Sequence, residues 1–149
     1  MKKTVTWLVL ADGQRARGYL YRGADLPPEP VVDFEMEHAG DPSREIGSDK
    51  PGRMQPSFGV GGTSFSPRND LHEQAEERFL DDVARKMADV VAAGRCDQLI
   101  LAAAPRALGY LRQKLAPGVS RVLKAEIPKD LTKTDLQKLA PLVAQQIGF

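Results

Sequence analysis

The stretch QLILAAA at residues 98–104, directly followed by Pro105, decides the fold class of this chain. Six of its seven residues are apolar, and a short continuous apolar run is typical of an inner parallel strand covered on both faces. Pro105 suits the first turn of a helix. The pattern therefore predicts a buried strand that feeds a helix, as in a parallel α/β sheet.

Three further strands are predicted nearer the N-terminus. Residues 4–11 are β-branched and apolar, and Asp12-Gly13 after them indicates a tight type I′ hairpin turn. Residues 15–22 and 31–37 alternate between apolar and polar, as antiparallel strands do when their two faces meet different environments. In the third strand the alternation predicts one inner face, formed by Val32, Phe34 and Met36.

Helical periodicity dominates the C-terminal half. An apolar stripe predicts a long helix that opens at Asp70, where Glu73 completes a capping-box-like start, and ends at Gly94. A helix over 105–116 follows, then a fifth strand over 119–127.

A last helix opens at Thr134 and completes the order β-β-β-α-β-α-β-α. An antiparallel meander followed by parallel crossovers gives an α/β fold, a mixed five-stranded sheet with helices packed on it, of the ribonuclease-H-like plan. The length fits one domain over residues 1–149.

Residues 38–69 interrupt this order. They are rich in glycine, proline, serine and charge and show no period, so we expect a long mobile loop. Basic residues stand beside Phe58 and Phe65, a composition that can hold phosphate and stack bases, although a solvated loop has the same composition. The candidate RNA- or phosphate-binding residues are Arg44, Lys50, Arg53, Gly61, Gly62, Thr63 and Arg68.

A second candidate site lies where the strand at 98–104 feeds its helix. Open α/β sheets bind ligands beyond the carboxyl ends of their strands, and a helix N-terminus attracts anions. Arg106 and Arg112 are therefore candidates for an anion site. The small alanines before them equally fit close packing of the helix on the sheet.

The sequence gives little indication of a catalytic or metal-binding site. Asp12 ends the first strand without a second acid at a matching strand end, so we interpret it as a turn residue. His38 and His72 have no cysteine or acid at ligand spacing, and Cys96 has no evident base partner. We expect no catalytic residues, no metal site and no cofactor.

Composition sets further bounds. The net charge of +1 gives no global reason for tight nucleic-acid binding, although a local basic patch can still contact RNA. One cysteine excludes an intrachain disulfide and fits a reducing compartment. No apolar stretch approaches the roughly 20 residues of a membrane helix, so we expect a cytoplasmic protein without a membrane partner.

Four motifs in order resemble the bacterial host attachment protein family. They are Ala11-Asp12-Gly13 with Ala16-Arg17, Asp49-Lys50-Pro51-Gly52-Arg53, Ala104-Pro105-Arg106-Ala107-Leu108-Gly109 with Leu111-Arg112, and Lys129-Asp130-Leu131-Thr132. The name of that family implies a role in the attachment of bacteria to host cells.

The family in turn resembles the middle domain of archaeal and eukaryotic class I peptide release factors, where a basic loop carries a Gly-Gly-Gln motif before a long helix. Gly61-Gly62-Thr63-Ser64 stands at that location here. Threonine lacks the glutamine amide, so the resemblance implies the fold and a ribosome or tRNA partner but not peptide release.

The leading expectation is therefore a non-enzymatic cytoplasmic module that contacts the ribosome or tRNA through residues 44–68. A regulatory factor that acts in attachment through protein–protein contacts is the alternative. A third hypothesis is an ester hydrolase that uses Thr63 or Ser64 with His72.

Overall fold

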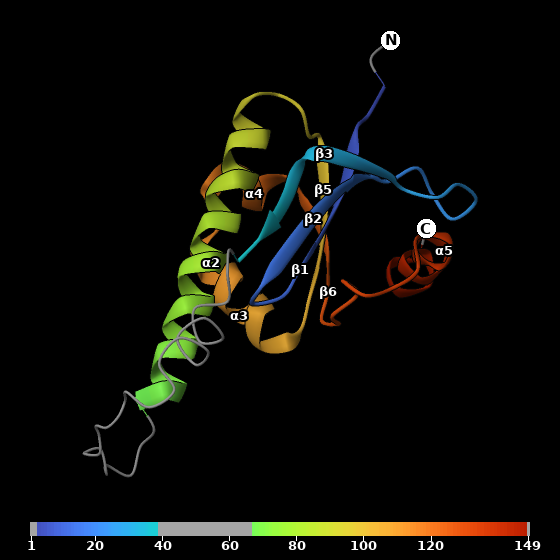
Figure 1. Cartoon of the computed structure of the whole chain (residues 1–149). Coiled ribbons are helices and arrows are strands. Elements are labelled where there is room, and N and C mark those ends of the chain that lie inside the picture. Colours follow the sequence, from blue (N-terminus) through green and yellow to red (C-terminus); the bar gives the residue numbers. More distant parts are fainter. Residues whose placement is uncertain (1–2, 39–66, 149) are drawn as a thin grey trace.

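The computed structural model, which describes residues 3–38 and 67–148, is built around a mixed five-stranded sheet (Figure 1). The strand order is β3-β2-β1-β5-β6. Strand β2 is antiparallel to both of its neighbours, β1 and β3, and β5 and β6 run parallel to β1. This arrangement confirms the predicted α/β sheet of the ribonuclease-H-like plan. The strand bounds are β1 Thr6–Ala11, β2 Arg15–Leu20, β3 Glu29–Glu37, β5 Gln98–Ala103 and β6 Leu123–Ile127.

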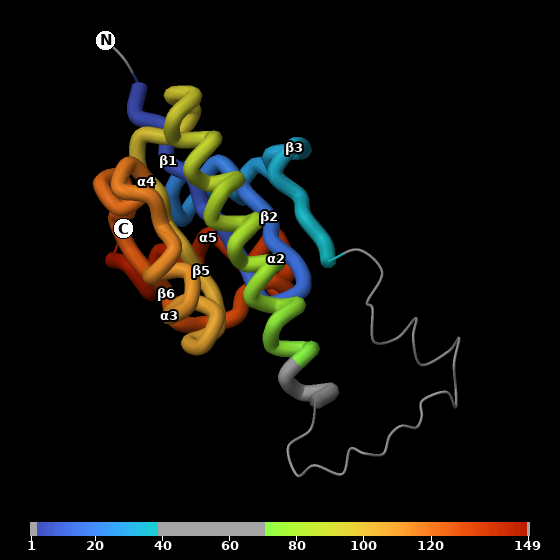
Figure 2. The backbone as a smooth tube through the Cα atoms, turned by 90° about the vertical axis from the view of Figure 1, so that its left-hand side faces the viewer, coloured from blue at the N-terminus to red at the C-terminus, as the bar shows by residue number. Residues whose placement is uncertain are grey.

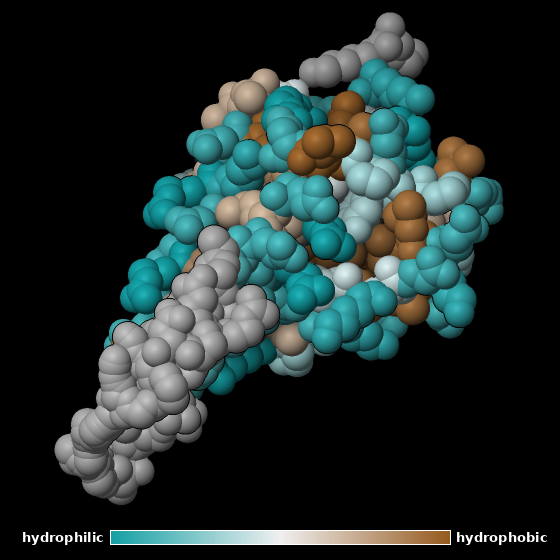
Figure 3. All heavy atoms as spheres, in the orientation of Figure 1, coloured by the Kyte–Doolittle hydropathy of each residue, from teal (hydrophilic) through white to brown (hydrophobic). Residues whose placement is uncertain are grey.

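Helices cover both faces of this sheet (Figures 1 and 2). Three of them, α2 (Pro67–Ala92), α3 (Pro105–Lys114) and α4 (Pro117–Val122), pack on one face. The last helix, α5 (Leu136–Ile147), packs on the other. Apolar side chains also gather on the surface between α2 and α5, where the outer strands run (Figure 3).

Because helices cover both faces of the sheet, its inner strands β1 and β5 can be apolar along almost their whole length. In β1, Trp7 and Val9 join the core under α2, α3 and α4, whereas Leu8 and Leu10 join the core under α5. All four are at most 2 % exposed, and burying one such side chain stabilises the fold by about 1.5–3 kcal/mol. A strand buried on both sides needs no polar face, as the run at 98–104 predicted.

The predicted inner face of β3 is wrong at Val32, whose side chain is 85 % exposed. The pairing of β2 with β3 shifts register between Arg17 and Tyr19. This irregularity turns Val31 toward the core in place of Val32, while Phe34 stays buried. A register shift reverses which side chains face inward, so alternation within β3 alone could not reveal it.

The long helix α2 begins at Pro67, three residues before the predicted start at Asp70. Proline is well placed in the first turn because it lacks the N–H that would be unpaired there. Asp70 therefore lies inside the helix and does not cap it. Glu73 forms an ion pair with Arg106 of α3 instead of closing a capping box.

The predicted strand over 119–127 is wrong in its first half. Residues Pro117–Val122 form the short helix α4, and β6 begins only at Leu123. The carbonyl of Ala116 accepts hydrogen bonds from the N–H groups of Val119 and Ser120, and the Val119 side chain is fully buried. Pro117 thus opens a new helix as well as following the end of α3.

Candidate functional site

The carboxyl ends of the three parallel strands gather most of the motif segments. Asp12 follows β1, Ala104 follows β5, and Asp130 lies in the connection after β6. Because β1, β5 and β6 are neighbours and parallel, these segments meet at one edge of the sheet. We call it the carboxyl edge, and it is the edge at which open α/β sheets bind their ligands.

The turn between β1 and β2 is held by the Asp12 side chain. Its Oδ1 atom accepts hydrogen bonds from the N–H groups of Gln14 (2.7 Å) and Arg15 (2.8 Å). Gly13 does not have the positive φ of a type I′ turn, so that predicted turn type is wrong. The structure thus confirms Asp12 as a turn residue, although the turn is not of type I′.

Thr132 links this turn to the connection between β6 and α5. It is the one buried polar residue among those the structure describes. Its hydroxyl donates to Asp130 Oδ1 at 2.6 Å and lies 3.2 Å from Asp12 Oδ2, and its N–H donates to Asp130 Oδ1 at 3.0 Å. We call this set the Thr132 clasp. Within residues 3–38 and 67–148, no group of three or more His, Cys, Asp or Glu residues could hold a metal ion.

The described chain before the predicted RNA-binding loop ends at His38, beside the β1–β2 turn. The N–H of His38 donates to the Gln14 carbonyl at 2.7 Å, and the His38 ring lies 6.2 Å from the Phe79 ring of α2. Pro67, where α2 begins, is twelve residues before Phe79, or about 18 Å along the helix.

The loop residues predicted to contact RNA lie outside the described part of the chain. These are Arg44, Lys50, Arg53, Gly61, Gly62 and Thr63. Ser64, the other candidate nucleophile, lies there too, and Arg68 is described only as backbone in the first turn of α2.

A groove opens between α2 and α3 beside the β1–β2 turn. Its volume is about 260 Å³. The α2–α3 groove is lined by Gly13, Glu73, Glu76, Glu77, Leu80, Arg106, Ala107, Tyr110 and Gln113. A Cβ atom on Gly13 would lie only 2.7 Å from Glu76 Cδ, so the missing side chain lets the turn and the helix approach each other.

Charges in the α2–α3 groove are mostly negative. Arg106 Nη2 lies 2.6 Å from Glu73 Oε2, and the hydrogen bond to Glu73 with its charge raises the pKa of Arg106. Glu76 and Glu77 raise the pKa of Arg106 further through their charges. The one guanidinium therefore sits in a field set by three carboxylates.

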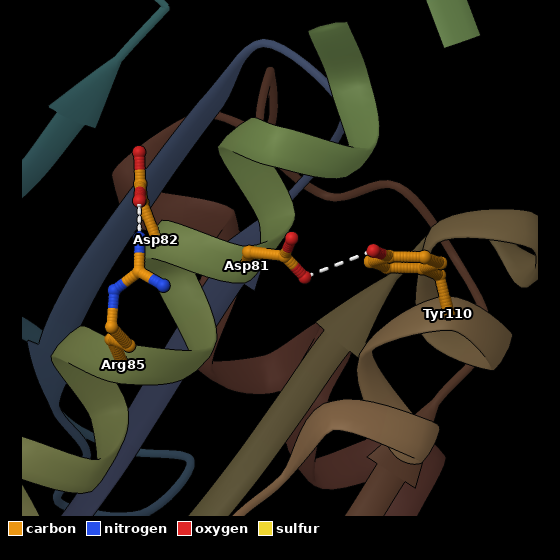
Figure 4. Close-up of polar contacts among 4 residues, drawn as sticks. All are labelled: Asp81, Asp82, Arg85 and Tyr110. Carbon is orange, nitrogen blue, oxygen red and sulfur yellow. Dashed lines mark hydrogen bonds and ion pairs between the residues drawn. The ribbon is translucent and has the colours of Figure 1, made fainter. Parts of the chain in front are cut away.

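Tyr110 joins α3 to α2 (Figure 4). Its hydroxyl donates to Asp81 Oδ1 at 2.9 Å. Burial, followed by this hydrogen bond and the charge of Asp81, raises the pKa of Tyr110 to about 12. The Lys114 Nζ atom lies 5.4 Å from the centroid of the same ring, within the range of a cation–π contact. The figure also shows the ion pair of Asp82 with Arg85 on α2.

The two arginines of the predicted anion site have separate partners. Arg106 binds Glu73 of α2, whereas Arg112 donates from Nε to Glu126 Oε1 of β6 at 3.0 Å. The hydrogen bond to Glu126 and its charge raise the pKa of Arg112. The structure does not bring the two guanidiniums together on one partner, and an anion would compete with a carboxylate at each. The anion site stays a prediction.

Cys96 matches the structural thiol expected from the sequence. Its side chain is buried, and Sγ lies 3.2 Å from the carbonyl oxygen of Gln98. Burial is the main cause that raises the pKa of Cys96 to about 11. A thiol with so high a pKa is a poor nucleophile near neutral pH.

Sequence reasoning missed the α2–α3 groove and the Thr132 clasp. One signal was present: Glu73, Glu76 and Glu77 share one helix face by their spacing of three and four residues. Which helix that face meets depends on packing. The clasp joins residues 120 positions apart in the sequence, and no local pattern indicates it.

Comparisons with known proteins add the following. A family described as "Protein required for attachment to host cells" matches residues 7–143. No curated protein matches the chain. Among solved structures, the archaeal translation termination factor aRF1 is similar with a TM-score of 0.48 and 12 % identity, over 95 % of this chain and 38 % of that one. This chain therefore spans well under half of that protein's length. Among the described residues, no helix combines the length and apolar character needed to cross a bilayer.

Proposed function

This chain belongs to the family of proteins required for attachment to host cells, as its four motifs predicted, and on that premise we propose that it is a non-enzymatic, cytoplasmic module that contacts the RNA of the ribosome or tRNA. The contact is made by residues 44–68. Lys50, Arg53 and Arg68 bind phosphates, and Gly61 and Gly62 allow the backbone to approach the RNA closely.

The distribution of charge along the chain carries this proposal. Residues 44–68 contain four cationic and two acidic residues, a net charge of +2, whereas the whole chain has a net charge of only +1. Both acidic residues, Glu45 and Asp49, precede Lys50, so residues 50–68 carry three cations and no acid. Two phenylalanines, Phe58 and Phe65, stand in the same stretch and can stack on unpaired bases. The described chain resumes after these residues at Pro67, where α2 begins, and stops before them at His38, whose N–H donates to the Gln14 carbonyl beside the carboxyl edge.

Three phosphate contacts set the expected salt dependence. For a single strand, each neutralised phosphate contributes about −0.7 to the slope of log K, where K is the association constant, against the logarithm of the salt concentration. Three contacts therefore give an expected slope of roughly −2. The contact is then of modest affinity and weakens clearly between low and physiological salt.

Co-sedimentation with ribosomes tests the proposal. We expect the wild-type protein to pellet at low salt and Arg53→Glu to lose most of the pelleted fraction. Arg121→Glu on α4 is the matched control. This substitution makes the same change of charge at an exposed residue that is distant in the sequence from the loop. An unchanged pellet with Arg53→Glu, or no pelleting of the wild type, contradicts the proposal.

Cell fractionation tests the proposed location. We expect the protein in the cytoplasmic fraction, where the single, buried Cys96 stays reduced. Recovery on the cell surface would overturn the cytoplasmic assignment and favour a direct contact with the host.

A further inference from the structure

Two arginines lie next to each other on the α5-facing side of β2. Arg17 is opposite Leu10 in the sheet register, and Leu10 joins the core under α5. Successive side chains of a strand alternate between its faces, so Arg15 lies on the same side, with about 7 Å between the two Cα atoms. Further along this side Tyr19 is buried, whereas both arginines are partly exposed. The arginine end of this side is therefore accessible from water.

Each of the two guanidiniums has a buried donor without an acceptor. The Nε atoms of Arg15 and Arg17 are buried and have no hydrogen-bond partner among the described residues. Glu35 Oε2 lies 3.6 Å from Arg17 Nε, which is too far for a hydrogen bond. An unpaired buried donor costs stability, and native proteins keep few of them. Such a cost without a gain in packing is typical of functional sites.

The acids nearest to Arg15 do not neutralise it. Asp12 accepts two turn N–H groups with Oδ1, and its Oδ2 belongs to the Thr132 clasp. Glu37 is opposite Arg15 in the sheet register, but within the described part of the chain these two side chains form no ion pair. Arg15 therefore keeps a positive charge that no described carboxylate pairs with, unlike the two arginines of the predicted anion site.

Two guanidiniums this close together match a phosphate group. Arginine presents its donors in a planar fork, which binds phosphate through two parallel hydrogen bonds. The position favours RNA as the source of the phosphate. His38, the last described residue before residues 44–68, donates its N–H to the carbonyl of Gln14, which directly precedes Arg15. The described chain thus ends beside the arginines, a few residues before the segment that we propose to contact RNA.

We propose that Arg15 and Arg17 together bind one phosphate group, and that this phosphate belongs to the backbone of the bound RNA. RNA as the source rests on the proposed function, whereas the phosphate site itself does not depend on residues 44–68. Each partly exposed guanidinium turns Nε and one Nη onto the phosphate, so both unpaired donors gain an acceptor on binding. The Glu35 side chain, which is 62 % exposed, gives way into water.

Fluorescence anisotropy with a labelled uridine 15-mer tests the proposal. The pair variant is Arg15→Gln with Arg17→Gln, and the matched control is Arg22→Gln with Arg121→Gln, two exposed arginines outside the pair. We expect the pair variant to bind about tenfold more weakly and to lose about 0.7 of the salt slope, because one phosphate contact is gone. The control should change the affinity less than twofold. Equal weakening in both variants would show attraction by net charge alone and overturn the proposal.

A lysine variant separates the guanidinium fork from its charge. Arg15→Lys with Arg17→Lys keeps the positive charge and most of the methylene stem, so it also covers the case in which the glutamine variant misfolds. It should recover only part of the lost affinity, since an ammonium group cannot bind phosphate through a planar fork. Full recovery would contradict a site built from paired guanidiniums.

Further arms keep this proposal apart from the RNA contact of residues 44–68. If Arg53→Glu weakens uridine binding and the pair variant does not, the proposed function stands and RNA is the wrong source of the phosphate. If only the pair variant weakens binding, the phosphate site stands and the contact by residues 44–68 is wrong. Inorganic phosphate, compared with chloride at equal ionic strength, should raise the Tm of the wild type more than that of the pair variant. Equal shifts in Tm would refute the phosphate site without any use of RNA.

Discussion

Replacing Thr132 by valine removes one buried hydroxyl and keeps the shape of the side chain. The hydroxyl lies 2.6 Å from Asp130 Oδ1 and 3.2 Å from Asp12 Oδ2, and Thr132 is 7 % exposed. A hydrogen bond to a charged group contributes about 1.5–3 kcal/mol. Because Asp130 is exposed and water can replace part of the bond, we expect Thr132→Val to lower the free energy of unfolding by about 1–2 kcal/mol. In a chain of this size the Tm falls by roughly 3–6 °C.

Urea unfolding followed by circular dichroism measures this effect, with an unchanged m-value expected. Thr134→Val is the matched control, since Thr134 lies in the same connection and its side chain makes no hydrogen bond to the described residues. It should stay within about 0.5 kcal/mol of the wild type. In an Asp130→Ala background the cost of Thr132→Val should shrink by at least about 0.5 kcal/mol. If the cost is the same in both backgrounds, the clasp does not act through this hydrogen bond.

Three other predictions follow from the packing and the raised pKa values. Gly18→Ala would place a Cβ atom 2.9 Å from Phe34 Cγ and 3.0 Å from Trp7 Cζ3, so it should destabilise the fold by about 1–3 kcal/mol in urea unfolding; a variant as stable as the wild type would contradict this packing. Because the folded pKa of Tyr110, about 12, exceeds its ordinary value, the stability linked to this phenol is complete below the ordinary value and is lost as the pH rises through 12. Stability measured from pH 9 to 12 should therefore fall more steeply in the wild type than in Tyr110→Phe, and parallel curves would refute the assignment. Cys96, with a pKa of about 11, should react slowly with a thiol reagent in the native protein and rapidly in urea, and equal rates would show that it is accessible.

The sequence by itself determined the elements whose signal is local. The apolar run at 98–104 and the stripe along α2 predicted a buried parallel strand and a long amphipathic helix, and both are present. The order of strands and helices then left few topologies, because parallel crossovers are right-handed and neighbouring elements pair. The same order also predicted an anion site where β5 feeds α3, at Arg106 and Arg112, and that site stays a prediction.

Only the tertiary structure decided which side chains meet. Val32 is exposed because its strand shifts register against β2, and register is a property of two strands. Glu73 pairs with Arg106 because two helices pack side by side, and Thr132 reaches Asp12 across 120 positions of the chain. Periodicity reports the environment along one element. Contacts between elements depend on how whole faces pack, and that information is distributed over the entire chain.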